Sequence, residues 1–478
     1  MSFRTLALVV TLALSASWVS AGNHQMIHAF TGTTSDGSTP YYGDLVRSGS
    51  TLYGMTYAGG ESGLGTIFRV DTDGLNFDVI HDFTGSTTDG SQPTGSLTLD
   101  GSTLYGMTSF GGLHGIGTIF KIGTDGLGFS VIHDFNGTND GKWPSGSLTL
   151  IGSTLYGMGF RGGSGLHGTV FKVGTNGSGF TVLHPFTRGT NDGGWGYGSL
   201  TFDGSDTLYG MTYYGGTSNL GTIFKIDTVD GSGFALLHSF AGGYDDGQSP
   251  YGALTLIGST LYGMTCSGGA ASNSNGTIFK IGTGGGDITV LHRFAGGTAD
   301  GKYPYGSLSL NNTTLYGMTC SGGANNRGTI FKIDTVDGSG YQMFQSLAGQ
   351  PSDGSTPKGS LLLCDGQYYG MSYYGGTTTD FGTVFTEDFV RTAVARPLPG
   401  GGALAVWSVP NEEGFAEYRL QRRGGDGWTT VGSCPAGGGT AGSYALADPN
   451  GKEGSTYRLV AVKASGATLA DDQAFQAK

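Results

Sequence analysis

A four-residue sequence, Leu-Tyr-Gly-Met, returns about every fifty residues and constrains this chain more than any other feature. The tyrosines of the copies are Tyr53, Tyr105, Tyr156, Tyr209, Tyr262 and Tyr316, and a seventh copy, with Tyr in place of Leu, is centred on Tyr369. Successive copies are 52, 51, 53, 53, 54 and 53 residues apart. A period of this length is typical of proteins in which each repeat is one supersecondary unit. The sequence therefore predicts seven equivalent units.

Each unit contains the elements of a small antiparallel sheet. Gly-Thr-Ile-Phe or Gly-Thr-Val-Phe follows every copy, and an Asp-Gly pair precedes every copy. Four short segments rich in strand-forming residues are separated by glycine-containing turns, and in the third unit they cover residues 146–150, 154–158, 168–173 and 180–186. Four strands in this length fit a blade of a β-propeller better than a β-helix, whose rungs are shorter.

The composition agrees with an all-β fold that is rich in tight turns. Of 478 residues 94 are Gly, and each Gly inside a helix costs about 1 kcal/mol relative to Ala. The chain also has 24 Tyr, 26 Phe and 5 Trp and only 13% charged residues, which provides the apolar area that a large fold needs. We therefore expect an all-β chain with a seven-bladed β-propeller made of four-stranded blades.

The first and last strands of the repeat region predict how the propeller ring closes. Residues 26–30 form a lone fourth strand that no earlier strands precede. The seventh unit supplies only three strands, at residues 359–363, 367–371 and 382–385. Pairing of the N-terminal strand with these three would complete the last blade and remove the exposed edges of an open array.

The ends of the chain differ in texture from the repeats. Residues 1–21 have Arg4, an apolar run from Leu6 to Leu14 and small residues up to Ala21, which is the layout of a secretory signal peptide. We expect the propeller at residues 22–390 and a small β-sandwich at residues 391–478, with strands near 403–409, 416–422, 427–431, 443–447 and 456–463. The expected location is secreted or at the cell surface, and no later segment is apolar enough to cross a membrane.

Histidine and aspartate recur at fixed places in the repeats. The histidines are His28, His81, His133, His184, His238 and His292, with Gln345 in the last copy, and the Asp-Gly pairs begin at Asp36, Asp89, Asp140, Asp192, Asp246, Asp300 and Asp353. We interpret both sets as structural. His133 is expected to share an apolar face with Val131, Phe135 and Phe129, and each Asp to accept backbone N–H groups in a turn. One imidazole per blade is too far from the next to share a metal ion, so no metal site and no cofactor are predicted. A cation site where several Asp loops converge is the alternative.

The candidate ligand site lies in the loops where the units differ. In a propeller the loops before the first strand and between the second and third strands emerge on one face. The residues predicted to bind a ligand there are Tyr41, Trp143, Trp195, Tyr197, Tyr251, Tyr303 and Tyr305. Aromatic rings among Asn, Asp and Gly suit stacking on sugar rings or holding a peptide. The alternative is that these rings pack one loop against the next.

Several segments resemble known repeat families. Strand ends such as Met158 to Gly163 are similar to a kelch blade. More closely, Leu104 to Thr108, Gly111-Gly112 and Gly117 to Lys121 resemble the GloVer (Gloeo_Verruco) tandem repeat of secreted bacterial proteins, and the resemblance covers residues 26–390. It implies an exported surface or envelope protein and implies no catalytic residues. Tyr457 to Lys463, together with Trp407, resembles a fibronectin type III domain.

Two classes of function fit these observations. The net charge of −12 and the lack of basic runs in the mature chain make nucleic acid a poor partner. The first class is an exported, non-catalytic binding or scaffold protein whose partner is an extracellular glycan or an envelope protein. The alternative is an extracellular kelch-type enzyme, such as a copper oxidase or a glycan-active enzyme. A kelch propeller followed by a sandwich resembles galactose oxidase, and outside the repeated position the histidines available as copper ligands are His24, His114 and His167.

The four cysteines do not form a predicted disulfide framework. Cys266 and Cys320 hold equivalent places in successive repeats and are expected to be free thiols. A bridge between Cys364 and Cys434 is the alternative that would tether the two domains.

Overall fold

The computed structural model describes residues 24–269, 274–364, 367–377, 380–388, 392–397, 403–409, 415–424, 427–435, 442–451, 455–463, 468–470 and 475–476. The predicted signal peptide, residues 1–21, lies outside these ranges. The described residues form strands and turns without a helix, which confirms the all-β prediction. The chain divides into two compact units, one containing His24–Phe389 and the other containing Val390–Pro410 and Phe415–Lys478. Among the described residues, we find no helix of the length and apolarity that a membrane span requires.

Every repeat forms an antiparallel sheet with one strand order. In the first sheet, β3 (Val46–Ser48), β4 (Thr51–Thr56), β6 (Thr66–Asp71) and β7 (Asp78–Asp82) lie side by side. Gly54 of β4 pairs with Phe68 of β6, and a Cβ on Gly54 would lie 2.5 Å from the Phe68 ring. The glycine of the Leu-Tyr-Gly-Met motif therefore makes room for the phenylalanine of the Gly-Thr-Ile-Phe motif, which explains why the two motifs occur together.

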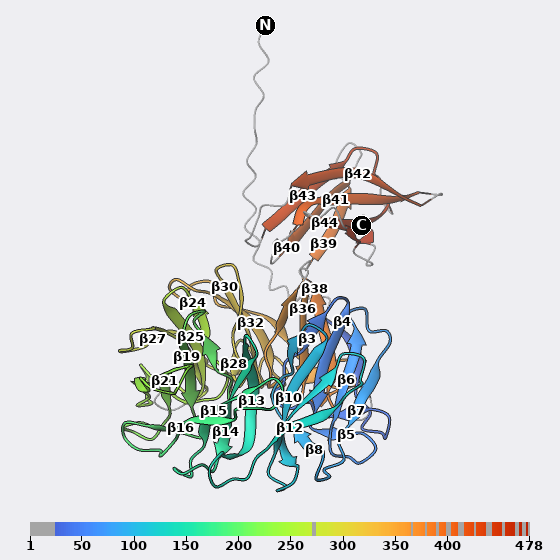
Figure 1. The fold of residues 1–478 in the computed structure, drawn as a ribbon. Coiled ribbons are helices and arrows are strands. Elements are labelled where there is room, and N and C mark those ends of the chain that lie inside the picture. Colours follow the sequence, from blue (N-terminus) through green and yellow to red (C-terminus); the bar gives the residue numbers. More distant parts are fainter. Residues whose placement is uncertain are drawn as a thin grey trace. The chain divides into compact units, whose positions relative to one another are not determined.

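The next five sheets follow in chain order around the first unit (Figure 1). The second has β8 (Gly90–Pro93), β9 (Thr98–Asp100), β10 (Thr103–Gly111), β11 (Thr118–Gly123) and β12 (Ser130–Asp134), and the third has β13 (Lys142–Ile151), β14 (Thr154–Arg161), β15 (Thr169–Gly174) and β16 (Thr181–Pro185). The fourth has β18 (Thr201–Phe202), β19 (Thr207–Thr212), β21 (Thr222–Asp227) and β22 (Ala235–Ser239), and the fifth has β23 (Gly247–Pro250), β24 (Thr255–Ile257), β25 (Thr260–Gly268), β26 (Thr277–Gly282) and β27 (Thr289–Arg293). The sixth has β29 (Ser309–Asn311), β30 (Thr314–Thr319), β32 (Thr329–Asp334) and β33 (Gln342–Ser346).

Short two-stranded ladders tie the loops of some repeats together at one end of the sheets. They pair β2 (Gly37–Ser38) with β5 (Ala58–Gly59), β17 (Gly193–Gly194) with β20 (Tyr214–Gly215), β28 (Gly301–Lys302) with β31 (Ser321–Gly322), and β34 (Gly354–Ser355) with β37 (Tyr374–Gly375). In the second, third and fifth sheets the corresponding segments pair within the main sheet, as β8 with β10, β13 with β14 and β23 with β25. The loops that carry the candidate site are therefore held by backbone hydrogen bonds.

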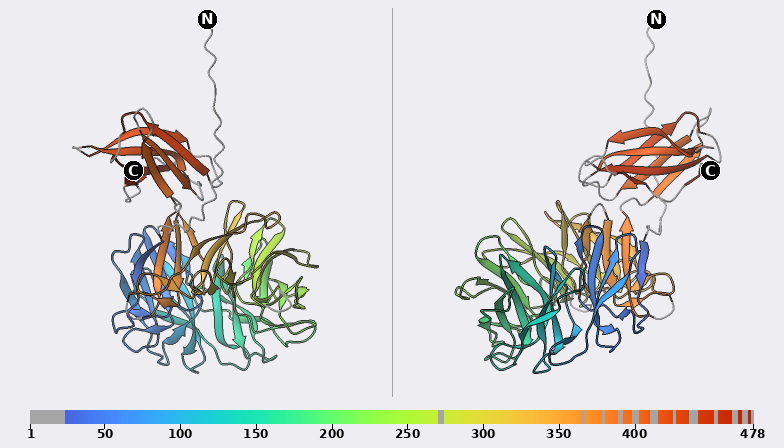
Figure 2. Two further views of the ribbon diagram at one scale, coloured as in Figure 1. Left: turned by 180° about the vertical axis from the view of Figure 1, so that it is seen from behind. Right: turned by 45° about the vertical axis from the view of Figure 1, so that its right-hand side comes forward.

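The seventh sheet combines strands from both ends of the repeat region. Its order is β1 (His24–Ala29), β38 (Thr383–Asp388), β36 (Gln367–Ser372) and β35 (Leu362–Cys364). Figure 2 shows β35, β36 and β38 in orange beside blue strands from the start of the repeat region. Ile27 and Phe30 are buried in one core cluster with Phe68 of the first sheet and Val384 of the seventh. The N-terminal strand thus packs between the last and first repeats.

The seven sheets also meet at their first strands. A Cβ built on Gly146 would lie 2.5 Å from the carbonyl oxygen of Gly198 in the next repeat. The same close approach joins each of these central glycines to its successor, in the order Gly43, Gly95, Gly146, Gly198, Gly252, Gly306 and Gly359, and Gly359 in turn approaches Gly43. Hydrogen bonds also connect successive repeats here. Ser96 Oγ accepts the Asp44 N–H at 2.7 Å, and Ser147 Oγ accepts the Ser96 N–H at 2.8 Å.

The second unit contains two sheets. One has the order β39 (Thr392–Pro397), β40 (Ala403–Val409) and β43 (Gly442–Asp448). The other has β42 (Gly427–Pro435), β41 (Phe415–Gly424), β44 (Thr456–Lys463) and β45 (Thr468–Ala470), with β46 (Phe475–Gln476) also paired to β44. The five predicted strands are present, and β39, β45 and β46 were not predicted. Tyr418, Leu420 and Tyr457 are fully buried here, whereas the side chain of Trp407 is outside the described part.

Candidate binding site

The loop that leads into each sheet contains one residue whose backbone conformation is the same in every repeat. These seven residues, which we call the outer position, are Thr39, Gln92, Trp143, Trp195, Ser249, Tyr303 and Thr356, and their φ angles lie between 52° and 62°. Such a left-handed conformation costs about 1–3 kcal/mol for a residue other than Gly. A backbone hydrogen bond to the preceding repeat stabilises this conformation. The Trp143 N–H donates to Ile116 O and the Trp195 N–H donates to His167 O, both at 2.9 Å. Side chains at the outer position are therefore presented rigidly.

A second set of side chains, the inner position, directly precedes the central glycines. It consists of Tyr42, Thr94, Ser145, Tyr197, Tyr251, Tyr305 and Lys358. Tyr251 stacks on Tyr42 with ring centres 4.4 Å apart and on Tyr197 at 4.1 Å, and Tyr305 meets Tyr251 edge-on at 5.2 Å. Burial in this cluster raises the pKa of Tyr42, Tyr197 and Tyr305. The inner tyrosines pack mainly on one another across the middle of the face.

A small cavity lies among these rings and the first strands. Its volume is about 30 Å³, which is enough to hold water, and Asp44 lines it with a set of serines. Asp44 occupies the place that serine holds in most other repeats, and its carboxylate accepts the Ser360 N–H. Burial raises the pKa of Asp44. Asp44 is not among the residues predicted from the sequence, although a lone carboxylate at a serine position is a visible signal.

Lys358 is the only charged residue among the seven inner positions. Its Nζ lies 4.4 Å from the ring centre of Tyr41 and 4.1 Å from that of Tyr373, which is within cation–π range. Burial lowers the pKa of Lys358. Tyr41, one of the predicted ligand residues, is therefore covered by Lys358, which is not among the residues predicted from the sequence.

Trp143 and Trp195 lie close to a shared arginine. The Arg161 guanidinium is 4.2 Å from the ring centre of Trp195, 5.3 Å from that of Phe160 and 5.8 Å from that of Trp143. Arg188 approaches Trp195 from the next loop, at 5.2 Å. Both tryptophans remain partly exposed. At the outer position of the sixth sheet, the ring centre of Tyr303 lies 5.6 Å from Lys302 Nζ.

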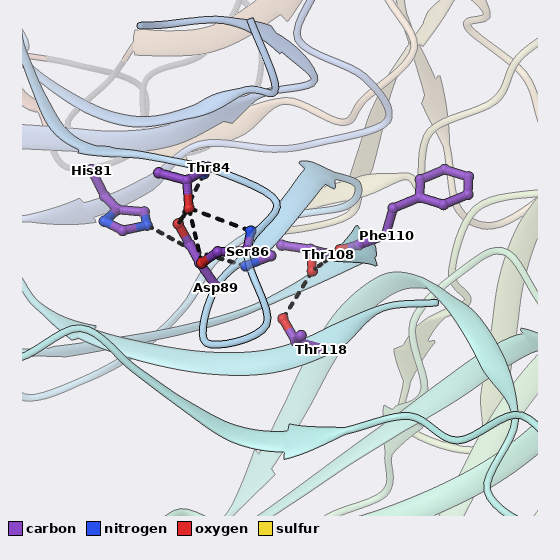
Figure 3. Close-up of polar contacts among 8 residues, drawn as sticks. His81, Thr84, Ser86, Asp89, Thr108, Phe110 and Thr118 are labelled. Carbon is purple, nitrogen blue, oxygen red and sulfur yellow. Dashed lines mark hydrogen bonds and ion pairs between the residues drawn. The ribbon is translucent and has the colours of Figure 1, made fainter. Parts of the chain in front are cut away.

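The repeated histidines and aspartates form pairs. In Figure 3, His81 Nε2 lies 3.1 Å from Asp89 Oδ1, and Asp89 Oδ2 accepts the Thr84 N–H and the Thr84 hydroxyl, each at 2.9 Å. Close to this pair, the buried hydroxyls of Thr108 and Thr118 form a hydrogen bond with each other at 2.8 Å, and the ring of Phe110 points away from them. Equivalent pairs are His28–Asp36, His133–Asp140, His184–Asp192, His238–Asp246 and His292–Asp300. Burial raises the pKa of Asp89, but the hydrogen bonds from His81 and Thr84 outweigh it and leave the pKa below its usual value.

The surroundings expected for His133 need correction in one respect. Its ring stacks on Phe180 of the next repeat, with centres 3.7 Å apart, and Phe129 stacks instead on His81 of the preceding repeat at 3.8 Å. A β-bulge between Ile119 and Phe120 shifts the register of β12 against β11. The simple alternation along the strand therefore does not hold there, and each imidazole bridges two repeats.

The residues considered for other chemistry are dispersed. Within the described part of the chain, no three His, Cys, Asp or Glu side chains gather as a metal site would require. His114 is exposed. The backbone oxygen of His167 accepts the Trp195 N–H, and burial and the charges of Arg188 and Arg161 lower the pKa of His167. Cys266 and Cys320 are buried free thiols, and burial raises the pKa of Cys266 to about 11.

Comparison with known proteins gives one family match. A family model described as the Gloeobacter/Verrucomicrobia repeat matches residues 15–193, 87–275 and 261–395. No curated protein matches the chain.

Three solved structures illustrate the distant similarity that was found. The periplasmic gluconolactonase of Pseudomonas aeruginosa is 16% identical, with 84% of this chain and 100% of that chain covered and a TM-score of 0.41. A quinohemoprotein alcohol dehydrogenase from Comamonas testosteroni is 12% identical, with coverage of 91% and 78% and a TM-score of 0.39. A putative TolB from Agrobacterium tumefaciens is 12% identical, with coverage of 52% and 78% and a TM-score of 0.34. None of these similarities informs what this chain binds.

Proposed function

The chain belongs to the Gloeobacter/Verrucomicrobia repeat family, and from that premise we propose that it is an exported, non-catalytic binding protein whose aromatic loop face takes up an extracellular glycan. An envelope protein is the alternative partner. The location, secreted or at the cell surface, is part of the proposal and rests on the signal-like residues 1–21.

The proposed scaffold is a seven-bladed, kelch-like propeller at residues 22–390, closed by the N-terminal strand. Two observations support closure. β1 pairs with β38 in the seventh sheet, and the series of central glycines runs from Gly43 through every repeat and back to Gly43. The second unit, residues 391–478, is proposed to be a fibronectin type III-like sandwich, since its sheets contain β39-β40-β43 and β42-β41-β44-β45. The sandwich would act as a spacer or docking module.

The observation that carries the binding proposal is the rigid presentation of Trp143 and Trp195. All seven outer positions share one backbone conformation, yet the side chain varies from Thr and Ser to Trp. A scaffold that fixes the backbone and varies only the side chain is suited to recognition, because the rings need not be ordered on binding. Partly exposed indole rings offer the flat apolar surface on which a sugar ring stacks.

The inner tyrosines have a different role in this proposal. Tyr197 and Tyr251 stack on one another and Tyr305 meets Tyr251 edge-on, which supports the packing interpretation for them. They form the floor of the site, and the outer tryptophans form its contact surface. Of the seven candidate ligand residues, Trp143 and Trp195 are therefore the two whose loss should affect binding most.

A glycan-array screen of residues 22–478 tests the proposal. The test variant is Trp143→Gln with Trp195→Ser, which inserts the residues that the second and fifth repeats carry at the same position (Gln92 and Ser249). Tyr244→Ala is the control, because Tyr244 is an aromatic residue 60% exposed outside this cluster. The proposal predicts a specific glycan signal that the double variant abolishes and the control keeps. No signal on any glycan would overturn it.

A further inference from the structure

The aromatic face gathers positive charge in a protein whose net charge is −12. The side chains concerned are Lys142, Arg161, Arg188, Lys302 and Lys358, and each lies over one or more aromatic rings of this face. Among the residues that the structure describes, no carboxylate forms an ion pair with any of the five. By contrast, Arg69 pairs with Asp78 at 2.8 Å and Arg293 with Asp245 at 3.0 Å.

Arg161 departs from the repeat at its position. The corresponding residues of the other copies are all uncharged: Ala58, Phe110, Tyr214, Ser267, Ser321 and Tyr374. The third copy also has Gly159 in β14 where the first copy has the buried Thr56 at the end of β4. Of these two departures, Arg161 lies against both tryptophans.

Buried donors at this place lack acceptors. Within the described part of the chain, Arg161 Nε and Trp143 Nε1 are buried and have no hydrogen-bond partner. Each carries one N–H, and an unsatisfied buried N–H is costly to a protein. In the described part of the chain, the side chain of Arg188 makes one hydrogen bond, from its Nε to Asn219 Oδ1 at 2.8 Å. An acceptor supplied by a ligand would satisfy these donors.

We infer that Arg161, Arg188 and Trp143 Nε1 bind the anionic group of an acidic sugar whose ring lies on the tryptophans. This inference rests on the proposed glycan-binding function and specifies its ligand class. A guanidinium that stacks on an indole keeps its N–H groups free at the edge of its plane, where a carboxylate or a sulfate can accept two of them. Lys142, 4.6 Å from the Trp143 ring centre, adds charge to the same place.

The rings favour a saccharide over an acidic peptide. A peptide bound to a β-protein is commonly added as a strand along an open sheet edge, whereas Trp143 and Trp195 present fixed apolar faces. Carboxylated and sulfated sugars share the required chemistry, so the test contains both.

The test compares matched saccharides in titration calorimetry with residues 22–478. One pair is trigalacturonate and its methyl ester, and the other is a sulfated galactan oligosaccharide and its desulfated form. The inference predicts that at least one charged member binds about tenfold or more tightly than its neutral partner. Arg161→Ala should weaken the charged ligand about tenfold and change the neutral one less than twofold. Ala is the residue of the first repeat at this position, so folding should be retained; Arg161→Ser, as in the fifth repeat, is the second variant.

Arg69→Ala removes the same charge from β6 and is the control, with an expected change below twofold. Equal binding of charged and neutral partners, unaffected by Arg161→Ala, would overturn the inference and leave the proposed glycan function standing. Absence of binding to every saccharide, on the array and in the titration, would overturn both. Binding of poly-L-glutamate as tight as that of the acidic sugars, with the same dependence on Arg161, would overturn the saccharide assignment in favour of an acidic peptide.

Discussion

His24 Nε2 lies 2.7 Å from Asp353 Oδ1, although the two residues come from opposite ends of the repeat region. Asp353 follows Gln345, the one residue that replaces histidine in its series. His24 stands four residues before His28, at the place where Phe77 precedes His81 and Tyr341 precedes Gln345. The imidazole that the sixth sheet lacks is therefore supplied by the N-terminal strand, and every repeated Asp has one imidazole.

The first prediction uses this exchange. His24→Phe inserts the residue common at that position and leaves Asp353 without an imidazole, so we expect the free energy of unfolding to fall by roughly 1–3 kcal/mol. Adding Gln345→His should restore most of it, because the histidine then stands in its usual place. Urea denaturation of the two single variants and the double variant measures the coupling. A double variant as unstable as His24→Phe would contradict the pairing.

The second prediction concerns acid stability. The pKa values of Asp36, Asp89, Asp140, Asp192 and Asp300 lie below the usual 3.8, because hydrogen bonds from histidine and backbone outweigh the effect of burial. A carboxyl whose pKa is lower in the folded state stabilises the fold above its unfolded pKa, and this stability is lost as the pH falls through the folded pKa. We expect the Tm to fall steeply below about pH 4. Asp89→Asn should lower the Tm at pH 7 and flatten the acid loss, and an unchanged acid slope would argue against this origin.

The third prediction tests the central glycines. Gly146 has a φ of +77° and a neighbouring carbonyl 2.5 Å from its virtual Cβ, so Gly146→Ala should cost several kcal/mol, well above the roughly 1–2 kcal/mol of left-handed strain alone. Gly152 is the matched control, with a φ of +58° and no atom within 4 Å of its virtual Cβ. Gly152→Ala should lose the strain energy only. Equal losses in thermal denaturation would show that the close approach of the sheets does not matter.

The fourth prediction compares the N-terminal strand with an internal one. Phe30 and Phe83 occupy equivalent positions, and both are 0% exposed. If β1 acts as an ordinary fourth strand, Phe30→Ala and Phe83→Ala should each cost about 3–5 kcal/mol. A loss below about 1 kcal/mol for Phe30→Ala alone would mean that β1 contributes little to the first unit.

The all-β fold and its repeated sheets could be predicted because they depend on local, periodic signals. Leu-Tyr-Gly-Met and Gly-Thr-Ile-Phe mark adjacent strands, and the pairing of Gly54 with Phe68 is the physical reason for their constant association. The His–Asp pairs could not be derived from strand alternation, because a bulge shifts the register beside His133. A signal was nevertheless present, since histidine precedes aspartate by seven or eight residues in every copy that has both.

The candidate site was predicted less completely. Aromatic residues that vary among the copies indicate a binding site. Whether each ring faces solvent or another ring depends on contacts between distant repeats. Tyr251 illustrates this, since it stacks on Tyr42 of the first repeat. Arg161 and Lys358 were missed although each is the only charged residue at its repeat position. A comparison of charge at every equivalent position would have identified both.

The most direct test of glycan binding at the aromatic face is fluorine NMR on protein labelled with 5-fluorotryptophan. Trp143→Gln and Trp195→Ser assign two of the resonances, and the saccharide that binds best on the array is titrated in. The account predicts that the resonances of Trp143 and Trp195 shift and saturate together, whereas those of Trp407 and Trp428 in the second unit do not move. A ligand that binds but shifts only Trp407 or Trp428, or leaves Trp143 and Trp195 unchanged, would contradict it.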